Sequence, residues 1–336
     1  MTDDQIAIQD MARKFTADAI TPYAAEWDEK SHYPVDVWKA AGELGFGAIY
    51  VSEESGGTGL GRLEAALIME AMSYGCPATS AYISIHNMAA WMIDCFGSAE
   101  LKARYLPELV SMEKIASYCL TEPGAGSDAA ALATRAELQG DHYVLNGSKK
   151  FITRATTADW LMVIARLDQG EKFIGLLVPR DAPGVHISAE VGKLGWFGVP
   201  ISSLTFSDVR IPVTHRLGEE GDGFSLAQDA LLRARIGHAA MALGRAIGAV
   251  EIAAAYACER NTFGKPLSTQ QGVQWMLADM VTQIEASRAL LYTAAQKYDH
   301  GDADTATFAS MAKLHATDLC MKVVTDSLQL TGGRGY

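Results

Sequence analysis

Apolar residues in the first third of the chain recur at intervals of three and four positions, which is the period of an amphipathic helix. Thr2, with Gln5 three residues later, matches a capping box at the start of the first such segment. The apolar positions that follow it are Ile8, Met11, Phe15 and Ala19. Pro34 suits the first turn of a second helix. The same periodicity predicts helices over 63–74, 82–96 and 99–109.

The pattern changes between 114 and 220. Leu204 and Phe206 alternate with polar neighbours, as in a half-buried strand. Short apolar runs of strand length occupy 160–165 and 173–178. Two dipeptides typical of hairpin turns are Gly140-Asp141 and Asn146-Gly147. No helical pattern separates these strands, so we expect an antiparallel sandwich or barrel.

From Phe224 to the end the pattern is helical again, and 239–255 is crowded with Ala and Gly, which lets helices approach closely. One apolar stripe consists of Val273, Leu277, Met280, Ile284 and Leu291. Asp302 or Asp304 is placed to cap a last helix that ends near Leu330. We therefore expect an α+β multidomain chain, with an all-α domain at 1–113, an antiparallel β-domain at 114–220 and a four-helix-bundle-like domain at 221–336.

Size, charge and cysteines narrow the function. A chain of 336 residues can form two or three domains with large cores. Its 40 acidic and 28 basic side chains give a net charge of -12, which argues against a nucleic-acid-binding protein but leaves room for local cationic contacts to an anionic ligand. The five cysteines and eight histidines form no metal-type spacing. Reduced, mostly buried thiols, no apolar run of transmembrane length and no leader peptide lead us to expect a cytoplasmic protein.

The glycine-rich patch at 56–61 does not have the spacing of a dinucleotide-binding loop, and the segments around it are helical. Such a loop needs a strand before it and a helix after it within a βαβ unit. We therefore expect a flexible connection between helices at this place.

The segment Ser117–Asp128 is the strongest candidate for a ligand site. An apolar run leads into a Thr-Glu-Pro turn and then into a loop of small residues. Such a loop can present several backbone N–H groups and two hydroxyls to one flat polar ligand. Taken alone, it could also be a simple surface turn.

Three later segments favour the ligand-binding interpretation. They are Phe151-Ile-Thr153, Arg260-Asn-Thr-Phe-Gly-Lys-Pro266 and Gln329-Leu-Thr-Gly-Gly-Arg-Gly-Tyr336. Together and in this order, the four segments resemble the acyl-CoA dehydrogenase family of flavoproteins. The resemblance covers essentially the whole chain. It implies a helical, a β and a helical bundle domain, with FAD held between the last two.

The resemblance also implies a reaction. Members of the family remove the α-proton of an acyl-CoA and pass the β-hydride to FAD, which yields a 2,3-enoyl-CoA, and the electrons leave through an electron-transfer flavoprotein. Residues 81–94 and 112–121 look like the branch of the family that acts on short branched acyl-CoA such as isobutyryl-CoA, in valine catabolism. The usual assembly in the family is a homotetramer, with FAD contacts across subunits.

Site residues follow from the same resemblance. One group would line the flavin edge: Tyr118, Leu120, Thr121, Gly126, Ser127, Phe151 and Thr153. A second group would contact the FAD of a neighbouring subunit: Arg260, Thr262, Phe263, Gln271, Gln329, Gly332 and Gly333. Ser127 and Arg235 would contact the acyl-CoA, although a surface ion pair is an equally good interpretation of Arg235. Many family members carry Trp where Phe151 stands, and Phe keeps the apolar wall while it loses one donor.

The catalytic base is missing from this set. Abstraction of the α-proton needs a carboxylate, and most of the family supplies a Glu shortly beyond the Gly-Gly-x-Gly-Tyr segment. The sequence stops at Tyr336, so we expect that Glu to lie beyond Tyr336 and the chain to be a fragment that is incomplete at its C-terminus. A minority of the family places the Glu before an Arg that matches Arg235, but Ala234 stands there. Glu122 is expected to be structural because it belongs to the Thr-Glu-Pro turn.

Three alternatives remain open at this point. The chain could act on another short-chain acyl-CoA. It could use the same fold as a flavin oxidase or monooxygenase. It could also be an inactive, truncated scaffold that binds FAD or acyl-CoA. No metal site, nucleic-acid contact or membrane span is expected.

Overall fold

The computed structural model describes residues 1–167 and 172–336. The chain folds into two compact units, each built from separate segments. The first unit consists of Met1–Ala24, Gly61–Ala81 and Leu232–Tyr336, and the second of Ala25–Leu60 and Tyr82–Leu231. This grouping cuts across the three consecutive parts expected from the sequence, because the helix at 62–75 joins the helices of the last third.

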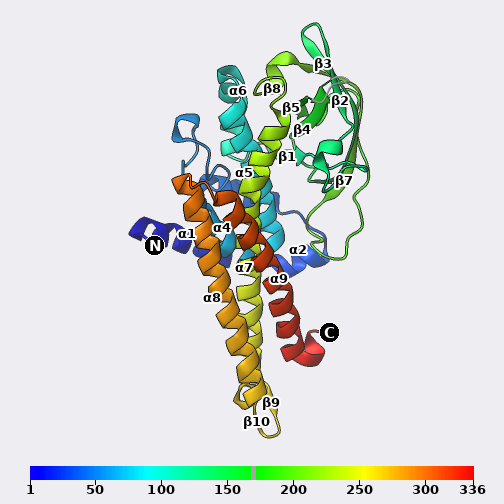
Figure 1. Ribbon diagram of the computed structural model, residues 1–336. Coiled ribbons are helices and arrows are strands. Elements are labelled where there is room, and N and C mark those ends of the chain that lie inside the picture. The colour runs from blue at the N-terminus through cyan, green and yellow to red at the C-terminus, as the bar shows by residue number, and fades with distance from the viewer. Residues whose placement is uncertain (168–171) are drawn as a thin grey trace. The chain divides into compact units, whose positions relative to one another are not determined.

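The first unit is helical. Its helices are α1 (Asp3–Phe15), α4 (Arg62–Gly75), α7 (Gly223–Glu259, which begins in the second unit), α8 (Gln271–His300) and α9 (Thr305–Thr331) (Figure 1). The capping box is confirmed, since the Thr2 hydroxyl accepts the Gln5 amide hydrogen and the Gln5 side chain accepts that of Thr2. The chain continues past α1 in a π-helical turn, Thr16–Ile20, which the pattern did not predict. A small hairpin of β9 (Asn261–Thr262) and β10 (Lys265–Pro266) joins α7 to α8.

The Ala- and Gly-rich part of α7 packs closely on α4, as expected. A Cβ atom added at Gly244 would lie 2.1 Å from the backbone oxygen of Glu70. The hydroxyl of Ser73 donates to the backbone oxygen of Met241 at 2.6 Å. The apolar stripe on α8 is also confirmed, because Met280, Ile284 and Leu291 are buried.

The expected cap of α9 is wrong in its chemistry. Asp304 occupies the cap position, but its carboxylate makes no capping hydrogen bond in the described chain. The Lys297 ammonium at the end of α8 lies 3.3 Å from the Asp302 carboxylate and 2.8 Å from that of Asp304. An ion pair with a full charge competes successfully with a single backbone N–H group. The two aspartates therefore tie α9 to α8 instead of capping α9.

Among the described residues, the second unit holds three shorter helices, the larger part of a fourth, the start of α7, and a sheet. Its helices are α2 (Ala24–Glu29, of which Ala24 belongs to the first unit), α3 (Val35–Glu43), α5 (Pro77–Phe96, from Tyr82) and α6 (Ala99–Val110). The glycine-rich patch at 56–61 is a loop whose backbone is hydrogen-bonded to 48–52, as in the bond from Leu60 N to Ile49 O. It follows a short 3-10 turn, Glu53–Ser55, and not a strand, so it lacks the setting of a nucleotide loop.

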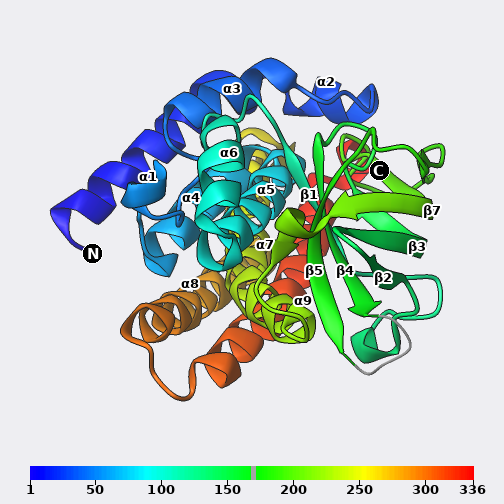
Figure 2. The same cartoon turned by 90° about the horizontal axis from the view of Figure 1, so that it is seen from above.

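Within residues 1–167 and 172–336, the sheet has eight strands in the order β6-β7-β3-β2-β4-β5-β8, and β1 pairs with β4 (Figure 2). The strands are β1 (Ala116–Cys119), β2 (Arg135–Gln139), β3 (His142–Thr153), β4 (Trp160–Leu167), β5 (Phe173–Pro179), β6 (Val185–Ile187), β7 (Ile201–Pro212) and β8 (Arg216–Leu217). Most pairs are antiparallel, as expected, but β1 and β2 both run parallel to β4. The expected antiparallel β-domain is therefore found, and the two parallel pairings with β4 are features that the sequence pattern did not predict.

One of the two predicted hairpin turns is also wrong. Gly140-Asp141 does connect β2 to β3, but Asn146-Gly147 lies inside β3, at a shift of the β3–β7 register. Gly147 has φ +144°, and an added Cβ would lie 2.6 Å from the Cα of Thr134. The glycine permits this close approach of two backbones, which is the other common reason for Gly in a strand.

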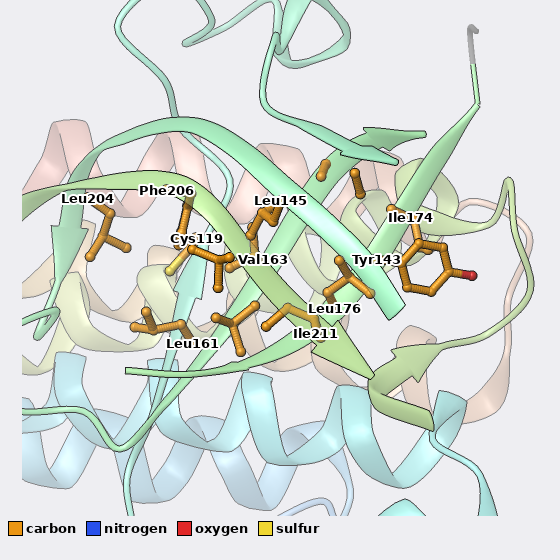
Figure 3. Close-up of a cluster of buried hydrophobic side chains, with 14 of the residues drawn as sticks. Cys119, Tyr143, Leu145, Leu161, Val163, Ile174, Leu176, Leu204, Phe206 and Ile211 are labelled. Carbon is orange, nitrogen blue, oxygen red and sulfur yellow. The ribbon is translucent and has the colours of Figure 1, made fainter. Parts of the chain in front are cut away.

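One core cluster of the second unit is formed by the strands of this sheet. Buried side chains from β3, β4, β5 and β7 form one cluster, and Figure 3 shows Leu161, Val163, Leu176 and Ile211 gathered within it. Strands from both halves of the strand order contribute to the cluster, with β7 and β3 on one side and β4 and β5 on the other. The sheet therefore bends around a single core, which fits a barrel-like expectation better than two separate sheets.

Two expectations about composition need correction. Cys76 and Cys119 are buried, but Cys95 and Cys258 are exposed and Cys320 is intermediate, so the thiols are not mostly buried; none of these five described residues forms a disulfide. Helix α7 is long and apolar enough to cross a membrane by length and composition, with a mean hydropathy of 1.3 over its best window. Half of that window is buried inside the protein, and core helices pass the same test, so this is weak evidence for a membrane span.

Candidate functional site

The loop at 120–134 leaves the sheet because β1 and β2 share one edge of β4. Residues 116–119 pair with 160–163, and residues 135–136 pair with 166–167, in the same direction. Strand β2 therefore continues the line of β1 along β4. The chain between them has no strand partner on that edge in the described structure and projects out of the sheet. The Thr-Glu-Pro turn and the small residues after it form this projection.

Glu122 holds the loop in shape. Its backbone exchanges two hydrogen bonds with Ala125, at 3.0 and 3.2 Å. Its carboxylate accepts the backbone N–H groups of Ala133 at 2.6 Å and of Thr134 at 3.1 Å. Burial alone would raise the pKa of Glu122, but these bonds and the ion pair with Lys149 outweigh it and lower the pKa. The Glu122 carboxylate therefore already binds two backbone N–H groups and one ammonium, which confirms the structural role expected from the sequence.

Lys149 on β3 completes this anchor. Its ammonium lies 2.7 Å from the Glu122 carboxylate, and the two side chains are 0% and 5% exposed. It also donates to the backbone oxygen of Leu120 at 3.0 Å. Burial lowers the pKa of Lys149, and the Glu122 charge opposes that shift. One buried cation therefore fixes both the start and the turn of the projecting loop.

The end of β3 lies beside this loop. The backbone N–H of Lys150 donates to the backbone oxygen of Thr121 at 2.8 Å, and the hydroxyl of Ser117 bonds to the backbone oxygen of Thr153. The structure thus brings together Thr121 and the segment Phe151–Thr153, which are about thirty residues apart in the sequence. Phe151 is 54% exposed and has φ +59°, so an aromatic ring stands in solvent at this edge.

Tyr118, Gly126 and Ser127 belong to the same region. The Tyr118 hydroxyl is buried and makes no hydrogen bond within 1–167 and 172–336, and burial raises the pKa of Tyr118. Leu120 is half-buried, and Ser127 is exposed. A Cβ added at Gly126 would meet nothing within 4 Å. The space in front of this glycine is therefore open to a ligand.

The second predicted group lies at one end of the helical unit, where α7 and α9 end and α8 begins. Arg260 follows α7 directly and is exposed. Thr262 pairs with Lys265 across the β9–β10 hairpin, and its hydroxyl has no hydrogen bond among the residues that the structure describes. Phe263, in the turn of this hairpin, is 96% exposed. Gln271 begins α8 and is exposed.

The chain end returns to this place. Gln329 lies in the last turn of α9, and Gly332 and Gly333 form the 3-10 turn after it. An added Cβ would meet nothing within 4 Å at either glycine. The guanidinium of Arg334 lies 5.5 Å from the ring centre of Tyr256 on α7, which ties this turn to the end of α7.

Arg235 and Ala234 lie elsewhere, near the middle of α7. Arg235 is exposed, and no ion pair of Arg235 is found among the described residues, so the surface ion pair considered for it is not seen. The backbone oxygen of Ala234 accepts a bond from His238 at 2.6 Å. The flavin-edge group belongs to the second unit, whereas Arg235 and the helix-end group belong to the first.

Two residues that position this site were not predicted from the sequence, Lys149 and His86. Lys149 could have been found, because a lysine at an inward position of an apolar strand needs a carboxylate nearby. His86 gave no signal, since a single histidine in an apolar helix has no distinctive pattern. Its ring nitrogens bond to the backbone of Ala116, the first residue of β1, and to that of Leu109.

Comparison with protein-family models gives a consistent result over the chain. The acyl-CoA dehydrogenase N-terminal domain matches residues 2–113, the middle domain 117–209 and the C-terminal domain 221–336. The chain is 46% identical to the mitochondrial isobutyryl-CoA dehydrogenase of Dictyostelium discoideum and 44% identical to that of Bos taurus. These matches cover 100% of this chain and 82% and 81% of the two relatives.

Solved structures agree with this result. The butyryl-CoA dehydrogenase of Megasphaera elsdenii superimposes with a TM-score of 0.96 at 35% identity, over 100% of this chain and 90% of that one. A chain from a structure described as the electron transferring flavoprotein of Acidaminococcus fermentans gives 0.97 at 38%, covering 100% and 89%. The FAD complex of PigA gives 0.95 at 30%, also covering 100% and 89%.

Proposed function

Because this chain belongs to the acyl-CoA dehydrogenase family, we propose that it catalyses the α,β-dehydrogenation of a short branched-chain acyl-CoA and passes the electrons to an electron-transfer flavoprotein. The enzyme is an oxidoreductase that acts on a CH–CH group, and its cofactor is FAD. The substrate we favour is isobutyryl-CoA, which would place the enzyme in valine degradation. Support for it comes from the two relatives at 46% and 44% identity, both of which are isobutyryl-CoA dehydrogenases.

The arrangement at the sheet edge supports FAD binding by the first group. When bound there, FAD supplies the hydride acceptor. The bond between Lys150 N and Thr121 O, at 2.8 Å, sets the projecting loop beside the end of β3. This is the observation that carries the proposal. Backbone groups of Leu120 and Thr121, and the hydroxyls of Thr121 and Thr153, are then rigid donors for a polar ring. The buried Tyr118 hydroxyl, which lacks a hydrogen bond in the described chain, and the exposed Phe151 ring fit a ligand at this edge.

We assign the second group to the pyrophosphate and adenosine of FAD bound in a neighbouring subunit. Arg260 presents a planar fork of donors that suits phosphate oxygens. Thr262 and Phe263 follow it in the hairpin, Gln271 begins α8 and Gln329 lies in the last turn of α9, and an added Cβ at Gly332 or Gly333 would meet nothing within 4 Å. An aromatic ring as exposed as that of Phe263 is consistent with contact to a partner. A homotetramer is the assembly that we propose on this basis.

Substrate contacts and the base complete the proposal. Ser127 and Arg235 are assigned to the acyl-CoA. Glu122 is excluded as the base, because its carboxylate already accepts bonds from Lys149, Ala133 and Thr134. Ala234 offers no carboxylate. We therefore assign proton abstraction to a Glu outside residues 1–336, and the relatives are indeed longer than this chain. A cytoplasmic location stays a prediction.

The test uses the protein purified from its complete gene. It should be yellow and tetrameric, and isobutyryl-CoA should bleach its flavin under anaerobic conditions faster than butyryl-CoA does. Reoxidation should require an electron-transfer flavoprotein and not oxygen. A preference for butyryl-CoA would change only the substrate assignment. Rapid oxygen consumption would indicate an oxidase or monooxygenase. A protein that binds FAD but is not bleached by any short acyl-CoA would refute the proposed reaction.

A further inference from the structure

The residue that follows the Phe151–Thr153 segment is a buried arginine. Arg154 is 1% exposed, and its guanidinium carbon lies 4.5 Å from the ring centre of Tyr33, 4.7 Å from that of Trp38 and 5.2 Å from that of Tyr82. The three rings also contact one another, with centres 4.4–5.0 Å apart. We call these three side chains the aromatic cage. All four residues belong to the second unit.

The cage is the main partner of this cation. Nε and Nη1 of Arg154 make no hydrogen bond within the described part of the chain, and no ion pair of Arg154 is found there. An arginine charge that is removed from water needs compensation. The faces of three aromatic rings supply it, because each ring carries negative potential over its face. Burial lowers the pKa of Arg154 to about 9, and the negative charge of Asp159 opposes that shift, so the side chain keeps its charge at neutral pH.

The backbone of Arg154 is unusual as well. Its φ is +63°, which L-residues other than Asn and Asp rarely adopt. Its N–H donates to the backbone oxygen of Pro200 at 2.7 Å, and its own backbone oxygen accepts from Thr157 at 2.9 Å and from Ala158 at 2.8 Å. Glycine would adopt this φ without strain. A buried cation therefore stands where the backbone alone would favour glycine, which indicates a role for the side chain.

The position of Arg154 suggests what that role is. Phe151, three residues earlier, also has a positive φ, of +59°, so β3 ends between two residues with an unusual backbone. Thr153 lies between them. Without an anchor, such an end would be free to adopt several backbone conformations. The aromatic cage comes from α3, from α5 and from the residue before Pro34, all of which lie outside the sheet.

We propose that Arg154 is a positioning residue, and that the aromatic cage grips its guanidinium to hold Phe151 and Thr153 in place against the flavin. This inference rests on the proposed FAD site at the same sheet edge. Arg154 itself does not contact the reacting atoms in this proposal. It acts through the end of β3, whose geometry decides how the Thr153 hydroxyl and the Phe151 ring meet the cofactor.

The test compares R154G, R154K and a control. R154G relieves the backbone strain at the positive φ but removes the guanidinium that the aromatic cage holds. R154K keeps a cation for the aromatic cage. The control is D208G. It also replaces a residue of positive φ, +51°, by glycine and so relieves backbone strain, but on an exposed part of β7. The readouts are the FAD dissociation constant, the visible flavin spectrum and the midpoint potential from anaerobic dithionite titration. None of them depends on turnover. Thermal unfolding shows whether each variant is folded.

We expect R154G to weaken FAD binding about tenfold or more and to shift the flavin spectrum, since misplacement by about 1 Å is enough for large effects at such sites. R154K should restore most of both properties, and D208G should match the unaltered protein. Folded R154G with unchanged FAD affinity, spectrum and potential would overturn the inference. Failure of R154K to restore anything would also overturn it, because the aromatic cage would then not act through a cation.

Two further outcomes keep the result decisive. If R154G does not fold, Y33L replaces it, since this change removes one wall of the aromatic cage without touching β3. Y33L should then shift the same flavin readouts, and unchanged readouts would refute the proposal. If the unaltered protein does not bind FAD at all, that result refutes the proposed function, and with it the FAD site on which this inference rests.

Discussion

Nδ1 of His86 accepts the amide hydrogen of Ala116 at 3.2 Å, and Nε2 of the same ring donates to the backbone oxygen of Leu109 at 2.8 Å. These two bonds assign the neutral ring with its hydrogen on Nε2, because one nitrogen must accept while the other donates. Ala116 begins β1, so the histidine fixes the strand that leads into the site loop. Burial lowers the pKa of His86 to about 4.

This geometry predicts a specific dependence of stability on pH. The pKa of His86 is about 4 in the folded protein, against an ordinary value of 6.5. Between these values the unfolded chain binds the extra proton, so the free energy of unfolding falls as the pH falls from 6.5 to 4. The loss is at most about 3 kcal/mol. Urea unfolding at several pH values in this window, with saturating FAD, measures it.

H86Q is the matched variant, because an amide can also donate and accept but does not titrate. We expect the stability of H86Q to depend less on pH than that of the unaltered protein between 4 and 6.5. Equal slopes for both proteins would show that His86 does not cause the loss.

The buried pair of Lys149 and Glu122 gives a second prediction. K149M leaves the Glu122 carboxylate buried with only backbone donors, and removal of one partner of a buried ion pair costs about 3–5 kcal/mol. The free energy of unfolding should fall by that order, and FAD should bind more weakly because the loop loses its anchor. Denaturant titration and FAD binding measure the two effects. K30M is the control, since the pair of Lys30 and Glu26 is exposed on both sides. Equal stability for K149M and K30M would contradict the anchoring role.

Local patterns in the sequence predicted the local features well. The capping box at Thr2 and Gln5 and the turn at Gly140-Asp141 depend on residues close in the chain, and both are confirmed. The helices at 63–74 and 99–109 are found within one or two residues as α4 and α6. Family resemblance then supplied the order of helical and β domains, which the fold confirms.

Features that depend on distant contacts were not predictable in this way. Nothing near Ala116 in β1 or Arg135 in β2 reveals that these two strands pair with the same edge of β4. Because they do, the loop between them, at 120–134, projects out of the sheet. Gly147 looks like a turn residue in its dipeptide, and only the approach of Thr134 explains it. The aromatic cage around Arg154 joins residues far apart in the chain, and no periodicity announces it.

A third prediction concerns the hydroxyl of Thr153. T153V keeps the shape of the side chain and removes its donor, so the reduced flavin loses one stabilising bond. We expect flavin reduction by isobutyryl-CoA to slow about 10- to 100-fold with little change in FAD affinity. Stopped-flow reduction and FAD titration measure the two quantities. T157V is the control, since Thr157 is exposed four residues later. Similar rates for T153V and T157V would remove Thr153 from the flavin site.

A fourth prediction concerns Arg260 at the end of α7. R260M removes the fork of donors assigned to phosphate, and the FAD dissociation constant should rise about 10- to 100-fold, which is about 1.4–2.8 kcal/mol. K265M, on the neighbouring strand of the same exposed hairpin, should bind FAD normally. High salt should weaken FAD binding by the unaltered protein more than binding by R260M. A K265M variant as weak as R260M would point to general charge attraction instead of a specific contact.

The last prediction tests the packing of α7 on α4. A Cβ at Gly244 would lie 2.1 Å from the Glu70 backbone oxygen and 3.1 Å from the Tyr74 nitrogen, and neither atom can move without moving α4. G244A should therefore lower the free energy of unfolding by about 1–3 kcal/mol. Alanine otherwise favours helices over glycine, so G272A, where an added Cβ meets nothing within 4 Å, should raise it by about 0.4–1 kcal/mol. Denaturant unfolding of both variants measures the two effects. A loss of stability in G244A with a gain in G272A would show that steric contact, and not helix propensity, decides the effect at Gly244. Stabilisation by G244A would instead show that α7 and α4 are not packed as closely as these distances require.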